Sequence, residues 1–431
     1  MPKPIVCLSA TLRQFCEAFR GCFSQRQWKY FVIVLLGLIE CEQRRTLRGL
    51  LANIGEQVSL CGLSRFFHCW KWRPEDLAQV WLSRFRQQLQ TEVEAEHLRQ
   101  QAEREKRRGR PKKTVVTGYL IFDDSVHVKP RGWKMQGLGK HYSSTERRVV
   151  RGHSLLTGLY VLLGRRCPLQ PHLYRQRSVC QAENVPFQSK IELVIEAIQQ
   201  FEPLAGTQTH VLIDSWFHCK AVRKAAQKRG WEVSGGLKSN RKMRLIEADG
   251  SRHWISLAEY AAQLQPGDWQ EASWPSQEGK QKVYVHALRT HIRKLGPALL
   301  LITCKDPQAP TNTIRYWGST LLEAAPQTVI NILAIRWRIE VFFEDAKDLL
   351  GSDHYQLMSA EAIVRFWTLI ACLSCFLDEQ CAADSRLATW GDARRALQQE
   401  HQRNLLAWLY TQFQSGLTPL QIVQQLSLSS C

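Results

Sequence analysis

The chain has 431 residues, and its 58 Lys and Arg against 39 Asp and Glu give a formal net charge of +19. This length is enough for about three domains, and a hydrophobic content of 44% excludes a disordered or fibrous protein. The longest uninterrupted apolar run, residues 31–39, is half as long as the ~18 residues that a membrane span needs, and residues 1–15 lack the apolar stretch of a secretory signal. We therefore expect neither a membrane protein nor an exported one.

The surplus of basic residues predicts a polyanionic partner, and nucleic acid is the commonest polyanion in a cell. The 14 cysteines are scattered through the chain. Their one close pair, Cys372 and Cys375, has no second pair to complete four zinc ligands. We interpret the cysteines as structural thiols.

Residues 1–95 are predicted to form a compact helical domain, because apolar residues recur at intervals of three and four. This domain is either a DNA-binding head or a helical packing or dimerisation domain. Residues 96–114 are almost entirely polar and charged, which is typical of a solvated linker. Within the linker, Arg108 and Arg110 flank a glycine, a pattern similar to the core of an AT-hook that binds a narrow minor groove. The alternative is a linker that only attracts phosphates.

Residues 115–375 alternate between strand and helix patterns, which indicates an α/β fold. The predicted strands are 115–126, 153–164, 209–216 and 231–237, and the predicted helices between them are 189–201 and 218–230. A loop rich in Gly, Lys and Arg separates the first two strands at 129–152, and a β-rich insertion is predicted at about 250–320. Helices are predicted again at 325–351 and 360–377, followed by a polar helical tail.

Carboxylates directly follow two of the apolar strands. Asp123 and Asp124 end the first apolar run, and Asp214 follows the run THVLI. An ionised carboxylate at such a position is costly unless it is paired or binds a cation. One such residue alone is often a helix cap or an ion-pair partner. Two strands that end this way in one sheet indicate carboxylates that converge on a metal ion.

The predicted helix at 325–351 carries a third acid. At the helical period, Arg336, Glu340 and Lys347 fall within a stripe about 40° wide beside an apolar face. The alternative interpretation is an ordinary Arg–Glu surface pair. Glu344 lies on the same side of the helix and is the alternative acid.

This helix resembles the Y-x2-R-x3-E-x6-K signature of DDE-type transposases of bacterial insertion sequences. Arg336, Glu340 and Lys347 have the spacing of that signature, and Leu333 stands where the family has its tyrosine. The Asp-Asp-Ser segment at 123–125 and the segment LIDSWF are similar to the family's first and second acids. The resemblance implies an α/β, RNase H-like mixed sheet with flanking helices and a β-rich insertion, preceded by an all-α N-terminal domain.

The resemblance also implies a catalytic triad of Asp123, Asp214 and Glu340 that binds two Mg²⁺ ions, or Mn²⁺ in their place. Two such ions would activate a water or a 3′-hydroxyl and stabilise the leaving oxygen, and hard ions of this kind take oxygen ligands. Asp124 is the alternative to Asp123. The D-x-S/T pattern favours Asp123, and strand alternation places Asp124 on the other face of the sheet.

In the family, the equivalents of Arg336 and Lys347 hold DNA phosphates near the cut. The missing tyrosine at Leu333 would weaken binding of the DNA end and leave the metal site unaffected. A second group of basic residues is expected to line the DNA path, with a plain solvated loop as the alternative: Lys238, Arg241 and Lys242. A tryptophan of the family's insertion stacks on a displaced base, and the candidates here, each with core packing as the alternative, are Trp269, Trp274 and Trp317.

We therefore predict a DNA transposase that cleaves and joins double-stranded DNA at the ends of an insertion sequence. It is expected to act as a homodimer on DNA in the bacterial cytoplasm, at the nucleoid and away from membranes. The alternatives are a nuclease without strand transfer and an inactive, transposase-derived DNA-binding protein or repressor. The expected division is a helical DNA-binding domain (1–95), a basic linker (96–114), a catalytic domain (115–375) and a C-terminal helical region (376–431).

Overall fold

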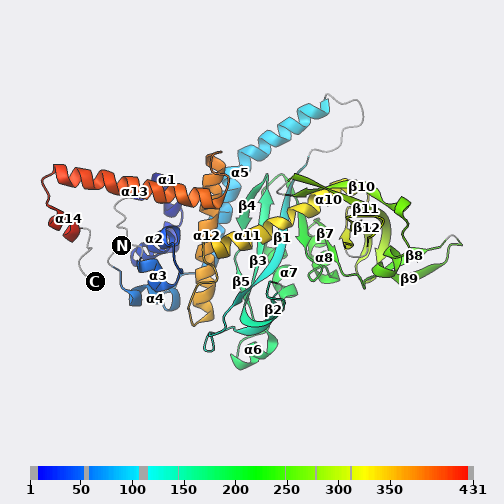
Figure 1. Ribbon diagram of the computed structural model, residues 1–431, viewed down its shortest axis with the longest axis horizontal. Coiled ribbons are helices and arrows are strands. Elements are labelled where there is room, and N and C mark those ends of the chain that lie inside the picture. The colour runs from blue at the N-terminus through cyan, green and yellow to red at the C-terminus, as the bar shows by residue number, and fades with distance from the viewer. Residues whose placement is uncertain are drawn as a thin grey trace.

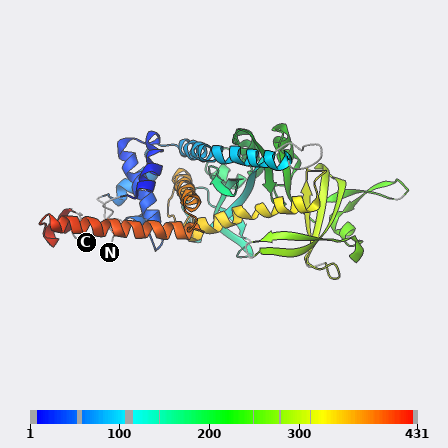
Figure 2. The ribbon, with the colours of Figure 1, turned by 90° about the horizontal axis from the view of Figure 1, so that it is seen from above.

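A computed structural model of the chain describes residues 8–52, 58–105, 115–143, 145–247, 249–276, 279–310 and 313–425. A large mixed sheet occupies the centre of the molecule, with a β-rich lobe at one end and a group of helices at the other (Figure 1). Seen from above, the long helix α5 lies on one side of the sheet, and helices α10 and α11 lie on the other (Figure 2). The predicted Arg108 and Arg110 lie outside the described residues.

The central part of the sheet has the strand order β2-β3-β1-β6-β7. Strand β1 pairs antiparallel with β3 and parallel with β6, and β6 pairs parallel with β7. This arrangement is RNase H-like, and the predicted fold class is confirmed. The strands are β1 (Val116–Val128), β2 (Gly139–Ser143), β3 (Arg148–Leu162), β4 (Arg165–Pro168), β5 (His172–Tyr174), β6 (Thr207–Ile213) and β7 (Glu232–Leu237).

Three helices connect these strands, and their boundaries follow local capping chemistry. Helix α7 starts at a capping box in which the Ser189 hydroxyl accepts from the backbone N–H of Glu192, and the Glu192 carboxylate accepts from the N–H of Ser189. The predicted helices at 189–201 and 218–230 are both confirmed. The connecting helices are α6 (Arg177–Ala182), α7 (Lys190–Gln200) and α8 (Lys220–Lys228).

The predicted loop at 129–152 is wrong in part, because it contains β2 and the first residues of β3. Strand β3 begins five residues before the predicted 153. Its first residues pair with β2 instead of β1, so that β2 and β3 form a hairpin beyond the end of β1. Because residues 139–152 contain glycines and several basic residues, their sequence does not show the alternation of apolar and polar residues that identifies a strand.

The β-rich insertion was predicted at about 250–320. Among the described residues six strands follow β7 and form a lobe that already begins at Lys242. Its strands continue the central sheet from β7 through β13, β12 and β11, and they enclose an apolar cluster of their own around Leu300 and Trp269. The elements are β8 (Lys242–Ile246), β9 (Arg252–Ser256), α9 (Leu257–Ala261), a 3-10 turn (Pro266–Asp268), β10 (Gln270–Ser276), β11 (Gly279–Ile292), β12 (Gly296–Cys304) and β13 (Arg315–Ser319).

The N-terminal helices share one continuous apolar core with the central sheet and with α12 (Ala360–Ala383). The buried guanidinium of Arg365 on α12 donates to the carbonyls of Phe67 and Trp72 and so ties the two parts together. Helix α12 alone, among the described helices, is long and apolar enough for a membrane span, and 89% of that stretch is buried in protein. It is therefore a core helix. The N-terminal helices are α1 (Ala10–Glu17), a 3-10 turn (Arg20–Cys22), α2 (Gln25–Glu40), α3 (Leu47–Ala52), α4 (Leu60–His68) and α5 (Pro74–Glu105).

Helix α5 continues through residues 96–105, which were expected to belong to the linker. The charged residues there form i,i+3 and i,i+4 ion pairs, such as those of Arg99 with Glu96 and Glu103, and such pairs support a solvated helix. At the other end of the chain the predicted helical tail is present. Its elements are α13 (Trp390–Gln414) and α14 (Pro419–Gln425).

The single helix expected at 325–351 is wrong, because the structure divides it at Arg336. Helix α10 (Pro326–Ile335) ends there, and α11 (Trp337–Asp348) begins there. The N–H of Arg336 bonds to the carbonyl of Leu333, and the N–H of Ile339 bonds to the carbonyl of Arg336, so the chain makes a tighter turn at this point. Arg336 therefore occupies a junction between two helices.

Candidate active site

The first two acids lie side by side at one edge of the sheet. The parallel register pairs Phe122 of β1 with Ile213 of β6, and therefore Asp123 and Asp214 follow as neighbours. One oxygen of Asp214 accepts hydrogen bonds from the backbone N–H groups of Trp216 (3.0 Å) and Phe217 (2.8 Å). These bonds fix the carboxylate of Asp214 where the strand ends.

Burial perturbs both carboxyl groups. Burial and the neighbouring carboxylate of Asp214 together raise the pKa of Asp123 to about 7, while the guanidinium of Arg336 acts in the opposite direction. Burial also raises the pKa of Asp214, and the two backbone N–H groups oppose this effect. Two adjacent carboxylates that resist ionisation form a site that a cation would stabilise.

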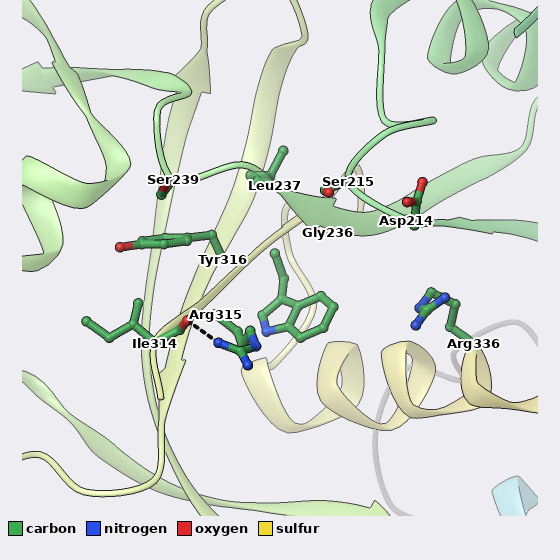
Figure 3. A pocket seen from close by; sticks show the side chains of 10 residues that line it. Asp214, Ser215, Gly236, Leu237, Ser239, Ile314, Arg315, Tyr316 and Arg336 are labelled. Atoms are coloured by element: carbon green, nitrogen blue, oxygen red, sulfur yellow. Dashed lines mark hydrogen bonds between the residues drawn. The ribbon is translucent and has the colours of Figure 1, made fainter. Parts of the chain in front are cut away.

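Arg336 connects the third acid to this pair. Its Nη1 donates to Oδ2 of Asp123 at 3.2 Å, and its Nη2 donates to Oε1 of Glu340 in the first turn of α11. Arg336 and Asp214 face one another across a pocket of about 370 Å³ (Figure 3). Arg336 thus links Glu340 to Asp123, the neighbour of Asp214, although the three acids are far apart in the sequence.

Asp124 lies on the opposite face of β1. Its carboxylate accepts hydrogen bonds from Lys190 Nζ (2.7 Å) at the start of α7 and from the hydroxyl of Ser154 (3.0 Å) on β3. It is therefore paired within the protein and directed away from Arg336. Glu344, the alternative third acid, lies one helical turn beyond Glu340 on α11 and is exposed.

The donor set of the site fits a hard divalent cation, because carboxylate oxygens are the ligands that such ions prefer. Burial and the neighbouring carboxylate of Asp214 both raise the pKa of Asp123, and a bound cation would oppose both effects. Across the described ranges, no three His, Cys, Asp or Glu side chains form a group that could hold a metal ion as they stand. The Arg336 guanidinium lies between Asp123 and Glu340 and supplies the positive charge there.

The other two positions of the helix motif have structural neighbours. Lys347 is half-buried, and its Nζ donates to the carbonyl of Val126 on β1 (3.4 Å), while burial lowers the pKa of its ammonium group. Leu333 is buried in an apolar cluster that joins α10 to the insertion strands β11 and β12. The residue at the tyrosine position of the motif is therefore part of a packing contact.

The predicted basic group after β7 lies near the same pocket. Lys238 and Lys242 are exposed, and Arg241 donates to the carbonyl of His218 at 2.8 Å. Leu237 and Ser239, on either side of Lys238, line the pocket that Asp214 and Arg336 also line.

Two of the three candidate tryptophans lie beside the site. Trp274 and Trp317 pack against each other with ring centroids 5.4 Å apart and line a groove of about 770 Å³ that extends to Arg336. Trp269, by contrast, is buried in the core of the insertion.

Sequence reasoning missed Trp216, which is 49% exposed only two residues after Asp214, and Trp337, an exposed residue beside Arg336. An aromatic residue two positions after a strand-end acid was the available signal for Trp216. Trp337 lacked a comparable signal, because its exposure depends on the break between α10 and α11.

The sequence is similar to a known protein family. The profile of the DDE superfamily endonuclease family matches residues 18–282, more than half of the chain. The match includes Asp123 and Asp214 and ends before Glu340. No curated protein matches the sequence. Endonucleases of this superfamily generally use divalent metal ions and act on DNA. The chain belongs to the DDE superfamily endonuclease family.

Proposed function

We propose that the protein is a DNA transposase that cleaves and joins DNA at the ends of an insertion sequence. The observation that carries this proposal is the meeting of Asp123 and Asp214 at one sheet edge, with Glu340 joined to Asp123 through Arg336. Three carboxylates linked in this way would suit phosphodiester chemistry that needs no covalent enzyme intermediate.

In this proposal Asp123, Asp214 and Glu340 hold two divalent cations, Mg²⁺ or Mn²⁺. When bound, such ions activate the attacking water or 3′-hydroxyl and stabilise the leaving oxygen. Asp123 is the first ligand, since Asp124 is already paired with Lys190 on the other face of β1.

Arg336 has two partners in this proposal. In the DNA-free protein its guanidinium neutralises Asp123 and Glu340, and with DNA bound it contacts a phosphate next to the cut. Lys347 and the basic group Lys238, Arg241 and Lys242 add positive charge along the DNA path. Trp274 or Trp317 is positioned to stack on an unpaired base, because both line the groove that reaches Arg336.

The rest of the chain would support this activity. The helical residues 1–95 would bind DNA, with the linker arginines Arg108 and Arg110 in a minor groove, and two copies of the chain would act on paired ends. The charge of +19 is consistent with a protein that stays at the bacterial nucleoid.

The test is a joining assay with purified protein, Mg²⁺, the inverted repeats expected on either side of the gene, and a supercoiled target plasmid. Joined products that disappear in Glu340→Gln, but persist in the matched variant Glu344→Gln, would support the proposal. Persistence of joining in Glu340→Gln would contradict it.

A nuclease without strand transfer is the second candidate, favoured by the endonuclease description of the matching family. Cleaved but unjoined ends in the same assay would identify that activity. DNA binding without cleavage would instead indicate the inactive DNA-binding protein or repressor, which the presence of all three acids argues against.

A further inference from the structure

The hairpin formed by β2 and the start of β3 carries a basic and aromatic surface that lies outside the candidate active site. Residues 129–151 contain seven basic side chains and one acidic one. Lys140 lies directly opposite Arg151, and Tyr142 lies opposite Val149. Directly opposed residues of an antiparallel pair project from the same face of the sheet.

Trp133 completes this surface, since the guanidinium of Arg151 lies 3.5 Å from the centroid of its ring. We call the five residues the hairpin face: Trp133, Lys140, Tyr142, Val149 and Arg151.

The large side chains of the hairpin face are unusually exposed. Trp133 is 70% exposed, Tyr142 65% and Val149 62%. The alternate residues of β2, His141 and Ser143, are buried on the other side of the hairpin. The hairpin thus packs through one face on the body of the protein and presents apolar and aromatic groups to solvent on the other, which is typical of an interaction surface.

The charges of the hairpin face identify the chemistry of the partner. Like charges directly opposite one another across an antiparallel pair, as in Lys140 and Arg151, destabilise the pairing. In the described part of the chain, neither residue has an acidic side chain as its ion-pair partner; Arg148 next to them is paired with Glu146. An anionic polymer would remove this repulsion, and an aromatic ring stacked on a guanidinium adds a surface for sugars and bases.

The hairpin is held in place by contacts at its base. Lys129 donates through Nζ to the carbonyl of Tyr355 (2.8 Å), and the N–H of Gln136 donates to the carbonyl of Met358 (2.9 Å). The side chain of Gln176 bonds to both the N–H and the carbonyl of Lys140. A partner therefore meets a surface that is already ordered, which lowers the entropy cost of binding.

The hairpin face lies on the same face of the sheet as Asp123, at a distance that can be estimated along β3. Thr157 of β3 lies opposite Asp123, and Arg151 lies six residues earlier on the same strand, so both project from the face that carries Asp123. At about 3.3 Å per residue they are about 20 Å apart along β3. This distance corresponds to about six base pairs of duplex DNA at about 3.4 Å per base pair.

We propose that the hairpin face binds the backbone of duplex DNA about six base pairs from the position that is cut. This inference rests on the proposed function and deepens it, since it names the surface that holds the DNA away from the reacting phosphate. Lys140 and Arg151 bind phosphates there, and Trp133 and Tyr142 pack against the sugar edge.

The test measures binding of a 30-base-pair duplex by fluorescence anisotropy between 0.05 and 0.3 M salt, in a buffer with chelator so that no chemistry is required. The double variant Lys140→Gln/Arg151→Gln should bind roughly tenfold more weakly at 0.15 M salt, and the slope of log affinity against log salt should decrease by about 2, one for each phosphate that is no longer bound. The melting temperature should stay the same or rise, because the opposed charges are gone. Trp133→Ala should weaken binding several-fold with an unchanged slope.

The matched control is Lys224→Gln/Lys228→Gln, which removes two exposed lysines from α8 and should change neither affinity nor slope appreciably. An unchanged slope in the hairpin variant, or an equal change in the control, would overturn the inference. Cleavage is assayed separately with the wild-type protein and Mg²⁺. If the double variant Lys140→Gln/Arg151→Gln binds DNA as the wild type does while the wild type cleaves DNA, this inference alone is wrong. If the double variant binds more weakly as expected but the wild type does not cleave DNA, the proposed function alone is wrong.

Discussion

Asp123→Asn should stabilise the metal-free protein at alkaline pH. Because the pKa of Asp123 is raised from 3.8 to about 7 in the folded chain, ionising this carboxyl group at pH 8 opposes folding. At about 1.4 kcal/mol for each pKa unit, the three units correspond to about 4 kcal/mol. Asparagine has nearly the same shape and carries no charge, and the variant therefore loses this penalty. It also loses the ionic part of its interaction with Arg336, which reduces the gain.

The sign of the pH dependence follows from proton binding. Between about pH 4 and pH 7 the folded state holds the Asp123 proton and the unfolded state releases it, so the stability of the wild type falls as pH rises through this window. The advantage of Asp123→Asn should accordingly grow by about 2–3 kcal/mol between pH 5 and pH 8.

Unfolding by guanidinium at pH 5 and pH 8, with chelator present, measures the difference in free energy of unfolding between Asp123→Asn and the wild type. Thermal melts with added Mg²⁺ then measure how a cation changes the stability of each protein. A cation that binds the carboxylates of the folded state should raise the melting temperature of the wild type at pH 8 and leave that of Asp123→Asn unchanged. The control Asp124→Asn loses the ion pair with Lys190 and should be destabilised, while its response to Mg²⁺ is retained. A pH-independent effect of Asp123→Asn would refute the reasoning, as would loss of the Mg²⁺ response in Asp124→Asn.

Two further substitutions test the surroundings of Asp214. Trp216→Ala should weaken binding of DNA ends roughly tenfold without changing the melting temperature, because the half-exposed indole near Asp214 is available for stacking on a base. The control is Trp254→Ala, which removes an exposed tryptophan of β9 and should bind DNA ends normally in the same titration. Gly235→Ala should destabilise the fold by about 2–4 kcal/mol in chemical unfolding and reduce cleavage, since its Cβ would lie 2.2 Å from the carbonyl oxygen of Ile213, the residue before Asp214. Gly267→Ala, where a Cβ meets no atom within 4 Å, should be neutral, and a neutral Gly235→Ala would count against the close approach of β7 to β6.

The sequence allowed the strands and the acids to be predicted because both depend on local signals. The apolar runs before Asp123 and Asp214 identify strands, and a charged residue at the end of such a run is visible without a structure. The register of β1 with β6 could not be predicted in this way, because about 80 residues separate the two strands and no local signal specifies how they align. The strand-end positions of Asp123 and Asp214 indicated that the two acids converge, but their direct adjacency depends on this register.

Two features could not be read from the periodicity of the sequence. Residues 325–351 keep a helical pattern across Arg336, since Arg336 itself keeps helical backbone angles at the break. In β2 and the start of β3, Tyr142 and Val149 place apolar side chains on the solvent face, which removes the alternation that identifies a half-buried strand. Both departures from the pattern coincide with surfaces that we propose contact DNA.

The charge state of the site also bears on how DNA approaches it. A phosphodiester that approached three ionised carboxylates would be repelled, and that repulsion is large where water is partly excluded. With a pKa of about 7, Asp123 is protonated in about half of the molecules at neutral pH, and Arg336 neutralises part of the remaining charge through its contacts with Asp123 and Glu340. The raised pKa of Asp123 and the guanidinium that lies between Asp123 and Glu340 thus both reduce the negative charge of the metal-free site.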